Sequence, residues 1–595
     1  MSEYYCEFIK EAFIHPIRSV LIVDDSYPTY DEVLCAQHLL NTGKKPDYQK
    51  GWYKNPKQVR GTIRKFREND PPLLVDVHDG MNIDAEAEKK IARHLHQSDL
   101  LVLDYELDQE KPEDGTQAIG ILRNLMANDH FNLVVIYTSK NLDHVFSEVR
   151  WGLASPCLNF LCENEETKAT ELIQEAEDEI QNLSDLIEKS IAEEQYFHSR
   201  LYSSSYLRTM GKGNQPYSEF FDLAGGTGWN PEERKLVLRY ALNQFEKSHL
   251  KVMNTEACNG DLVWSTKSSS RSAKWIKSKS VFICFSRKSN DDDLLNQLQV
   301  ALNDWGPNPS RLFLAKLRAA MDEYGVVAQT QALSSKYALA YWYNQLLYAD
   351  PLERRWHVAE SISRHSDQLM ETVLPKVRDF AKRLIDAEVK EGTIQHRCKD
   401  HFKVNLGIDQ TRTRAALEHN ALVCSRNPEG WHLTTGHIFS MCNEYWLCLS
   451  PACDMVPSQI SKWQRETFGE GLPFMAIKLQ QCKKNKVPSD VQSNRYLFLR
   501  FKDDVQIHCF NDPSGDASSP HWDTLYAKDA GKFNGEDFRF MVWRTEKDES
   551  ELVLRCHEAE VVSQLRYEYA LNLIHKLGVS LTRIGLGFSD GKPKT

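Results

Sequence analysis

The stretch "SVLIVDDSYPTYDE", residues 19–32, decides how the N-terminal part of the chain is interpreted. Four apolar residues, Val20 to Val23, run directly into Asp24 and Asp25. A short continuous apolar run bounded by turn residues is typical of a buried strand. Two adjacent carboxylates repel each other at the end of such a strand. The sequence therefore predicts a positive partner for them, first of all a divalent cation.

Similar apolar runs follow up to about residue 165 and alternate with segments whose apolar residues have helical spacing. These runs are "PLLVDV" (72–77), "DLLVLD" (99–104), "NLVVIYT" (132–138) and "CLNFL" (157–161). Short buried strands that alternate with helices predict a parallel sheet covered on both faces. Ligands of such sheets bind beyond the carboxyl ends of the strands. Four polar residues fall at those ends: Asp24, Asp25, Asp104 and Thr138.

The order of these residues resembles the receiver domain of bacterial response regulators, which has a CheY-like, flavodoxin-like α/β fold. The acidic pair matches "VLIVDD", the phospho-acceptor matches Asp104 in "LLVLDYEL", and the switch hydroxyl matches Thr138 in "VVIYTSK". The resemblance implies a metal site for Mg²⁺ at Asp24, Asp25 and Asp104. It also implies that Asp104 accepts a phosphoryl group and that Thr138 responds to it.

The chain departs from the receiver pattern where the family carries a lysine after its fifth strand. The expected strand reads "CLNFLCENEE" (157–166) and offers Cys162 and Glu163 in that place. Lys140 follows the fourth strand and would have to reach across the sheet edge. The sequence thus leaves three readings open: a phosphorylated domain, a domain that binds metal without phosphoryl transfer, and a binding platform.

Beyond the receiver-like part, the pattern predicts a mainly helical region and then a β-rich α+β domain. Residues 400 onward carry short apolar runs separated by Gly, Pro and Asn, followed by one amphipathic helix. The expected parts are a receiver-like domain at 1–165, a helical linker at 166–200, a mainly helical middle domain at 201–395 and a β-rich C-terminal domain at 396–595.

The charged segment 163–200 has isoleucines at a seven-residue spacing: Ile173, Ile180 and Ile187. About two and a half heptads are fewer than a coiled coil normally needs. The favoured interpretation is one amphipathic helix packed on its own domain. The alternative is a helix that forms a homodimer through residues 166–200.

One segment is basic in an otherwise acidic protein, and aromatic residues are interleaved with its charges. Basic groups with aromatic neighbours suit a phosphate-bearing or single-stranded ligand, although a solvated loop is the commoner explanation. A nucleotide ligand is the expectation carried by these seven residues: Lys267, Arg271, Lys274, Lys277, Lys279, Arg287 and Lys288.

A thiol site is a further candidate in the C-terminal part of the chain. Cys453 and Asp454 follow the apolar run "YWLCLS", and His437 is near in sequence. A cysteine beside a histidine can form a nucleophilic pair if positive surroundings favour the thiolate. A cysteine that only fills space in the core is the favoured interpretation.

The composition limits the class of protein. The chain has 595 residues with a net charge of −11, so only a local patch could bind nucleic acid. No apolar run is long enough to span a membrane, and the first residues do not form a signal peptide. The 14 cysteines include no CxxC pair, which indicates reduced thiols and a cytoplasmic location.

Together these features predict a multidomain bacterial signalling or regulatory protein whose receiver-like domain controls an output in residues 201–595. By family resemblance, such proteins act in phosphorelay with a histidine kinase or with an operon-encoded effector, often in stress or antiphage defence. Two alternatives stay open, namely an enzyme that makes or processes a nucleotide and a partner that restrains a toxic effector enzyme. The sequence does not decide whether the chain is an enzyme.

Overall fold

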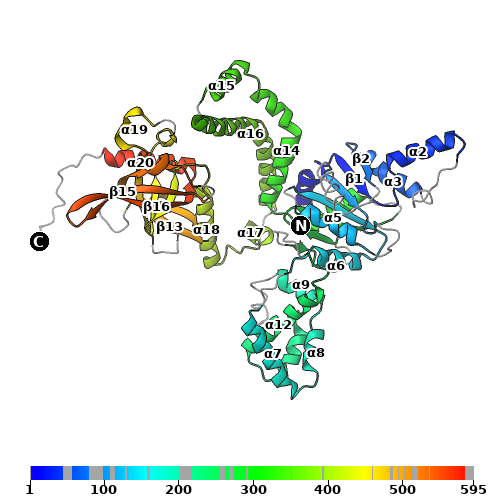
Figure 1. Cartoon of the computed structure of the whole chain (residues 1–595). Coiled ribbons are helices and arrows are strands. Elements are labelled where there is room, and N and C mark those ends of the chain that lie inside the picture. The colour runs from blue at the N-terminus through cyan, green and yellow to red at the C-terminus, as the bar shows by residue number, and fades with distance from the viewer. Residues whose placement is uncertain are drawn as a thin grey trace. The chain divides into compact units, whose positions relative to one another are not determined.

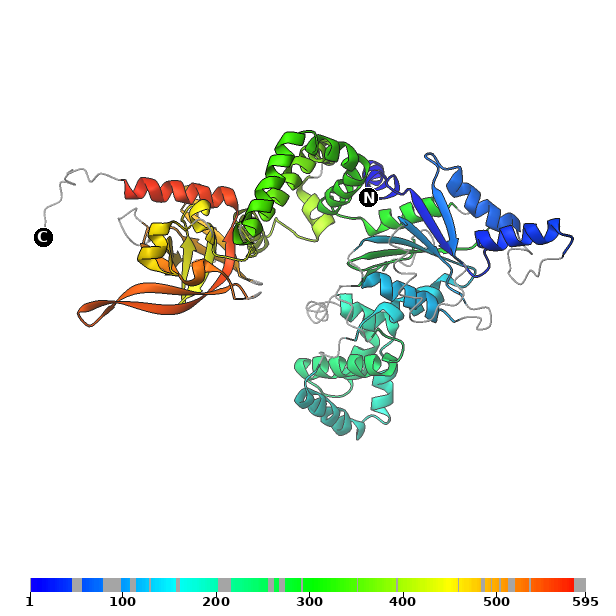
Figure 2. The ribbon, with the colours of Figure 1, turned by 45° about the horizontal axis from the view of Figure 1, so that its top comes forward.

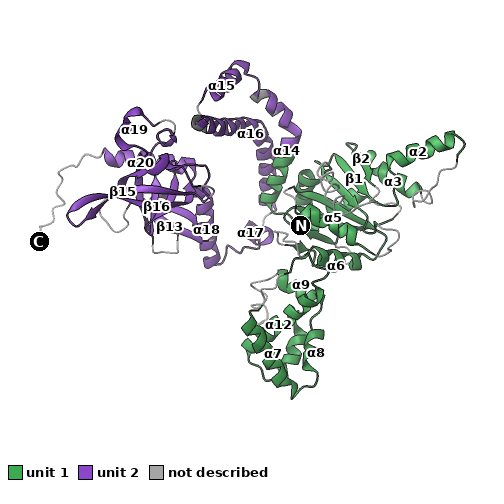
Figure 3. Cartoon of the chain, viewed as in Figure 1, with its two compact units in different colours: residues 1–319 green, residues 320–595 purple. Residues whose placement is uncertain are grey.

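The structure is a computed structural model, and it divides the chain into two compact units, residues 1–319 and 320–595 (Figure 3). Helix α14 (Pro309–Ala332) contains the boundary between them. The residues that the structure describes are 2–44, 56–78, 98–107, 114–127, 130–156, 161–201, 216–254, 262–266, 273–289, 293–349, 351–391, 394–457, 460–482, 487–493, 495–501, 504–511, 520–534 and 537–582.

The first unit is built on a seven-stranded sheet in the order β2-β1-β3-β4-β7-β6-β5 (Figures 1 and 2). Strands β2, β1, β3, β4 and β7 run parallel, and β6 and β5 extend the β7 edge in antiparallel pairing. The strands are β1 (Ser19–Val23), β2 (Leu74–His78), β3 (Leu100–Leu103), β4 (Asn132–Thr138), β5 (Val263–Trp264), β6 (Trp275–Lys277) and β7 (Val281–Arg287). If β7 is taken as the fifth strand, the parallel order is 2-1-3-4-5, the doubly wound flavodoxin-like order.

Helices cover both faces of this sheet because successive strand residues point to opposite sides. Leu101 and Leu103 of β3 and Val134 of β4 share one core with α5 (Thr116–Met126) and α6 (Leu142–Leu153). The helical segment α1 (Glu3–Ile9) with η1 (Lys10–Ile14) packs against α13 (Leu294–Trp305), which in turn packs on β7. Two more helices, α2 (Tyr30–Asn41) and α3 (Pro56–Arg67), follow β1, and α3 packs on β2.

A helical insertion separates β4 and α6 from the last three strands of the sheet. It consists of α7 (Glu163–Glu177), α8 (Leu183–Lys189), α9 (Glu193–Leu201), α11 (Ser218–Gly225) and α12 (Pro231–His249). It packs on α6 through Trp151, whose ring stacks on Tyr196 of α9 and on His249 of α12. Arg150 of α6 also forms an ion pair with Glu193 of α9. The insertion is thus part of the first unit.

The expected single helix over 163–200 is wrong, because the chain breaks after α7 at Asn182, which has a φ of +59°. Asparagine tolerates this left-handed conformation better than most residues, so it permits the turn. The heptad residues Ile173 and Ile187 are buried in the core that also contains Leu238 of α12, and Ile180 packs at its margin. These isoleucines are therefore packed within their own unit, as the favoured interpretation expects. They do not provide an apolar surface for the alternative, a homodimer through residues 166–200.

The first sheet extends beyond the domain limits that the sequence predicts. We predicted a receiver-like domain that ends at residue 165, but β7 joins the same sheet from the region assigned to the helical middle domain. The expected fifth strand "CLNFL" is mostly outside the described residues. The middle region is otherwise helical, with α14, α15 (Lys336–Tyr348), α16 (Pro351–Lys390) and α17 (Ile394–Phe402).

The C-terminal part is β-rich, as expected, and contains a closed antiparallel barrel. Its six strands pair in a ring because β10 contacts both β9 and β11. They are β9 (His437–Met441), β10 (Glu444–Cys448), β11 (Leu472–Gln481), β14 (Trp522–Ala527), β15 (Arg539–Asp548) and β16 (Glu551–Leu565). Closure removes the sheet edges and encloses a core that includes Trp446, Phe474 and Phe540.

Shorter elements complete this part of the chain. The hairpin of β12 (Tyr496–Phe501) and β13 (Asp504–Cys509) pairs with the end of β11, and β8 (Ser425–Arg426) pairs with β16. The remaining helices are α18 (Asp409–Cys424), η3 (Ala452–Met455), α19 (Lys462–Phe468), η5 (Val491–Ser493), η6 (Lys528–Gly531) and α20 (Tyr567–Leu581).

Two observations bear on the expected cellular environment. Cys482 and Cys509 are joined by a disulfide, which differs from the expectation that the thiols are reduced. Within the described part of the chain, no helix is both long enough and apolar enough to cross a membrane.

Candidate functional site

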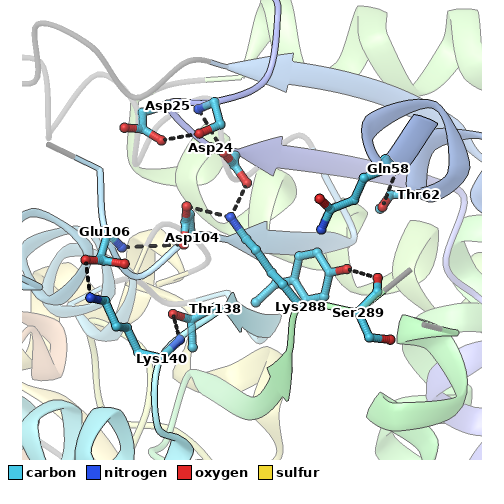
Figure 4. A network of polar contacts seen from close by, with 12 residues as sticks. Asp24, Asp25, Gln58, Thr62, Asp104, Glu106, Thr138, Lys140, Lys288 and Ser289 are labelled. Atoms are coloured by element: carbon cyan, nitrogen blue, oxygen red, sulfur yellow. Dashed lines mark hydrogen bonds and ion pairs between the residues drawn. The ribbon is translucent and has the colours of Figure 1, made fainter. Parts of the chain in front are cut away.

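Three carboxylates meet at the carboxyl edge of the first sheet (Figure 4). Strand β1 ends at Val23, directly before Asp24 and Asp25, and the adjacent strand β3 ends directly before Asp104. The backbone N–H of Asp104 donates to the carbonyl of Val23 at 2.8 Å, which holds the two strand ends side by side. Carboxylate oxygens of the three aspartates lie within 4.8 Å of one another, and all three residues are buried. The structure thus brings the predicted acidic residues together.

A lysine completes this cluster, and it is Lys288 (Figure 4). Its Nζ atom lies 2.7 Å from Oδ2 of Asp24 and 2.7 Å from Oδ2 of Asp104. Lys288 directly follows β7, and its backbone N–H donates to the carbonyl of Thr138 at 2.7 Å, so it continues the pairing with β4. Only 16% of its side chain is exposed. The expectation that the fifth strand lacks its lysine is therefore wrong.

Lys140 does not reach across the sheet edge to replace the fifth-strand lysine. Its Nζ atom lies 3.3 Å from Oε1 of Glu106, away from the three aspartates. Its backbone N–H donates to Oγ1 of Thr138 at 3.2 Å. Thr138 is fully buried at the end of β4, and this bond fixes its hydroxyl at the start of the loop that leads to α6.

Local hydrogen bonds orient the first two carboxylates. Oδ1 of Asp24 accepts from the backbone N–H of Ser26 at 2.9 Å. The hydroxyl of Ser26 donates to Oδ1 of Asp25 at 3.2 Å. A short polar side chain directly after a strand forms such turns readily. The turn therefore leaves Oδ2 of Asp24 for Lys288.

The third carboxylate is followed by Tyr105, whose hydroxyl donates to Glu148 of α6. The Tyr105 ring lies so close to Gly115 that a Cβ atom there would be 2.0 Å from a ring carbon. Only glycine fits at this position without movement of the ring. The strand end that carries Asp104 is thus held between α6 and the start of α5.

The charges at the site do not balance. Three carboxylates and one ammonium sum to −2 when all are ionised. Burial, together with the charge of Asp24, raises the pKa of Asp104 to about 7, although Lys288 opposes the shift. Burial acts against the charge of Lys288, but Asp104 and Asp24 outweigh it and raise the pKa of its ammonium above the usual value. The site therefore favours additional positive charge.

The donor set fits a hard divalent cation. Three carboxylates within reach of one another supply the oxygen ligands that Mg²⁺ takes, and a charge of +2 would neutralise the excess. The acidic edge is formed by strand ends and loops, so ligands can approach it from outside the sheet. Asp24, Asp25 and Asp104 are the residues that could hold such an ion.

The basic segment that was predicted to bind phosphate is only partly described. Lys267 and Arg271 are outside the described residues. Lys274 forms an ion pair with Asp143 at the start of α6. This lysine is thus already paired within the unit.

The other basic residues of the segment lie at two ends of β7. Lys277 and Lys279 precede the strand, and the ammonium of Lys277 lies 5.4 Å from the ring centre of Trp305. Arg287 and Lys288 stand at the carboxyl end, where Arg287 is exposed and Lys288 binds the aspartates. The described residues therefore form no continuous basic patch.

The candidate thiol pair is not formed, and the favoured interpretation of Cys453 as a core residue is also wrong. Cys453 is exposed, and its Sγ donates to Oδ1 of Asp454 at 3.3 Å. His437 is fully buried, with Nδ1 accepting from the N–H of Thr434 at 3.1 Å and Nε2 lying 3.2 Å from the carbonyl of Glu429. Burial lowers the pKa of His437 to about 3. Both ring nitrogens are occupied by backbone partners, so the imidazole has no free position for a thiol.

Sequence reasoning placed Lys288 in a basic segment and missed its contact with Asp24 and Asp104. A signal for it exists, because "SVFICFSRK" (280–288) is an apolar β-type run that ends in a lysine. The run predicts a strand, but the helical pattern around it gives no indication of the sheet to which that strand belongs.

Comparison with known proteins agrees with the geometry of the sheet edge. Residues 16–188 match the family model of the response receiver domain. No curated protein and no solved structure matches the chain. The match ends before β7, so Lys288 comes from beyond it. Both lines of observation identify a receiver-like domain in the N-terminal unit, and this domain marks the chain as a signalling or regulatory protein.

Proposed function

We propose that this protein is a phosphorylation-dependent regulator in which Asp104 accepts a phosphoryl group. Asp24, Asp25 and Asp104 hold a divalent cation, Mg²⁺ in the cell, and Lys288 and Thr138 respond to the new group. The observation that carries the proposal is the bridge from Lys288 Nζ to Asp24 and Asp104, at 2.7 Å each, beside the acidic cluster. The bridge supplies the lysine that residues 157–166 lack.

The chemistry at Asp104 is a simple displacement at phosphorus. A carboxylate oxygen of Asp104 attacks the phosphorus atom of the donor, a new P–O bond forms, and the bond to the leaving group breaks. The donor is a phosphohistidine of a kinase or a small acyl phosphate. A bound cation would neutralise the repulsion between the carboxylate and the phosphoryl oxygens. Water later attacks the phosphorus atom of the aspartyl phosphate, the P–O bond to Asp104 breaks, and inorganic phosphate leaves with the carboxylate restored.

Two residues of the chain can report the change of charge. The Lys288 ammonium already faces Asp104, so added phosphoryl oxygens would compete with Asp24 for it. Thr138 carries a hydroxyl at the adjoining strand end, and its loop leads directly to α6. Because α6 contacts the helical insertion through Arg150 and Trp151, a shift in this loop would act on the insertion first.

Partners follow from this proposal. An upstream histidine kinase would supply the phosphoryl group, and an effector protein would sense the altered domain. The nucleotide-enzyme alternative gains no support from the described residues, because the basic side chains predicted for it are separated. The restraint of a toxic enzyme and the role in antiphage defence rest on the family resemblance alone.

The direct test is the intact mass of the full chain after incubation with Mg²⁺ and acetyl phosphate. We expect a single phosphoryl adduct in the wild type and in Asp31→Asn, a control at an exposed aspartate of the same unit. Asp104→Asn should show no adduct. An adduct that persists in Asp104→Asn, or none in any folded protein, would contradict the proposal.

Cation binding is tested separately by thermal unfolding with and without Mg²⁺. The wild type should be stabilised by the ion, since binding to the folded state alone shifts the unfolding equilibrium. Asp25→Asn should lose most of this stabilisation, whereas Asp31→Asn should keep it. Equal stabilisation of both variants would place the ion elsewhere.

A further inference from the structure

A second group of reactive side chains lies in the C-terminal barrel, at the tip of the β9–β10 hairpin. Met441 pairs with Glu444, so Cys442 and Asn443 form a two-residue turn. Both turn residues have positive φ values, +52° and +61°. These angles belong to the left-handed region, which is sparsely populated by cysteine. The fold thus presents a cysteine, exposed, where a glycine or asparagine would be usual.

A histidine and a glutamate line up behind this thiol. Sγ of Cys442 lies 3.3 Å from Nδ1 of His557 on β16. Nε2 of the same ring lies 2.8 Å from Oε1 of Glu546 on β15. Nε2 makes no hydrogen bond of regular geometry, so Glu546 acts on the imidazole through its charge. Thiol, imidazole and carboxylate therefore stand in the order found in nucleophilic triads.

Strand pairing brings these residues together from distant parts of the sequence. Ser440 of β9 pairs with Glu560 of β16, which sets the hairpin tip beside His557. Strand β15, which carries Glu546, pairs along its whole length with residues 551–560 of β16. The side chains of His557 and Glu546 are 21% and 28% exposed. The group is therefore partly shielded behind an exposed thiol.

Cys442 also lines a surface hollow of about 500 Å³. Tyr445, Arg539 and Glu558 contribute to the same hollow. Adjacent strand residues point to opposite faces, so His557 and Glu558 lie on different sides of β16. Cys442 therefore contacts the imidazole of His557 and also borders a hollow that is large enough for a small reactant.

Two backbone amides add to the site. Among the described residues, the N–H groups of Cys442 and Asn443 donate no hydrogen bond to another part of the protein. Unpaired N–H groups beside a nucleophile are the donors that stabilise a developing oxyanion. The turn therefore offers both a nucleophile and donors for a carbonyl oxygen.

We propose that Cys442, His557 and Glu546 form a nucleophilic thiol site that accepts an acyl group from an ester, thioester or amide. His557 takes the thiol proton, Sγ attacks the carbonyl carbon, and a thioester forms. The bond to the leaving alcohol, thiol or amine breaks as His557 returns the proton to it. Water then cleaves the thioester and releases the acid. Glu546 is a positioning residue, because it contacts the imidazole and Arg555 but not the thiol.

The test compares cysteines within the full chain. Iodoacetamide alkylation, resolved by peptide mass spectrometry, should modify Cys442 more than ~10-fold faster than exposed Cys453 or Cys556 near pH 6.5, below the pKa of about 8.5 of an ordinary thiol. Cys556 is a matched control because it precedes His557 on the same strand.

The variants separate a reactive site from a chance contact. His557→Gln should reduce the rate at Cys442 to that of Cys453, and Glu546→Gln should move the midpoint of the pH–rate profile without removing the reaction. p-Nitrophenyl acetate should leave an acetyl group on Cys442, which Cys442→Ser lacks. Equal alkylation of Cys442 and Cys453, or an unchanged rate in folded His557→Gln, would overturn the proposal. So would acetylation confined to other cysteines.

Discussion

The carboxyl edge of the N-terminal sheet and the interior of the C-terminal domain both bury titratable groups, and they do so in opposite ways. The sheet edge collects charges, namely three carboxylates and the Lys288 ammonium. The C-terminal domain buries His432, His437 and His508 as neutral rings, because burial lowers their pKa values to about 4, 3 and 4.

The difference follows from topology. Parallel strands all end at one edge, where loops leave room for an ion or a phosphoryl group to compensate the charge. A closed barrel has no such edge, so its interior retains polar groups only in uncharged form. At the sheet edge the buried charges lie where a ligand can compensate them, whereas the buried neutral histidines of the C-terminal domain lie in a packed interior.

The largest expected effect is an opposite response of the two units to acid. The three histidines have folded-state pKa values below the unfolded value of about 6.5. Below that pH the unfolded C-terminal domain therefore binds more protons than the folded one. Its stability should be complete above that pH and fall as the pH drops toward 4, by about 8 kcal/mol at pH 4.5 when the three histidines are added.

The N-terminal site should respond in the other direction when no divalent cation is present. Asp104 has a raised folded-state pKa of about 7, so the folded state binds more protons between the unfolded value and pH 7. Its contribution to stability should rise as the pH falls through this window. Hydrogen exchange on peptides of β3 and β9 from pH 7 to 5 would measure both trends, and parallel trends would break the comparison.

The second effect is the loss of the lysine. Lys288→Met leaves two buried carboxylates without their common partner, and breaking a buried ion pair costs about 3 kcal/mol. We expect this loss in the unfolding free energy of the first unit without Mg²⁺ and a partial recovery with it. Lys279→Met, at an exposed position before β7, is the matched control. Equal stability of both variants would show that the bridge contributes nothing.

The third effect sharpens the account of the neutral histidines in the C-terminal domain. Neither ring nitrogen of His508 has a hydrogen-bond partner among the described residues, and the ring packs on Tyr445 and Phe501. His508→Phe removes the titrating group and keeps the ring contacts. Acid-induced loss of stability at pH 4.5 should shrink by roughly 2 kcal/mol. An unchanged urea midpoint at that pH would mean that His508 does not carry the effect.

The smallest effect concerns the contact between Tyr105 and Glu148. Tyr105→Phe removes one partly buried hydrogen bond between the end of β3 and α6, which costs about 1 kcal/mol. The first unit should unfold at a slightly lower urea concentration, and α6 peptides should exchange faster. Tyr30→Phe removes hydrogen bonds to Val75 of β2 and Arg67 of α3 instead, and it should leave the exchange of α6 peptides unchanged.

The three aspartates and Thr138 could be predicted from sequence because each follows a short apolar run directly. Each of these residues lies at the end of the strand that positions it, and the parallel strands place all four at one edge of the sheet. Lys288 follows an equally clear run, yet its strand pairs with β4 across the whole helical insertion. An apolar run indicates a strand but does not specify which partner it pairs with.

Two other features depended on the same kind of long-range information. The heptads of Ile173, Ile180 and Ile187 have the period of a continuous helix, but the turn at Asn182 and the packing against α12 decide their place. Cys442 and His557 lie 115 positions apart and meet only because β9 pairs with β16. Proximity in sequence suggests the pair Cys453 and His437. Such proximity does not determine which side chains meet in a barrel.

The measurement that tests the central claim most directly asks which lysine reads the phosphoryl group. Hydrogen exchange of the loop after Thr138 would be compared before and after acetyl phosphate in wild type, Lys140→Ala and Lys288→Ala, with the Asp104 adduct confirmed by mass. The account predicts a change of protection in wild type and Lys140→Ala and its loss in phosphorylated Lys288→Ala. A response that survives in Lys288→Ala but vanishes in Lys140→Ala would contradict it.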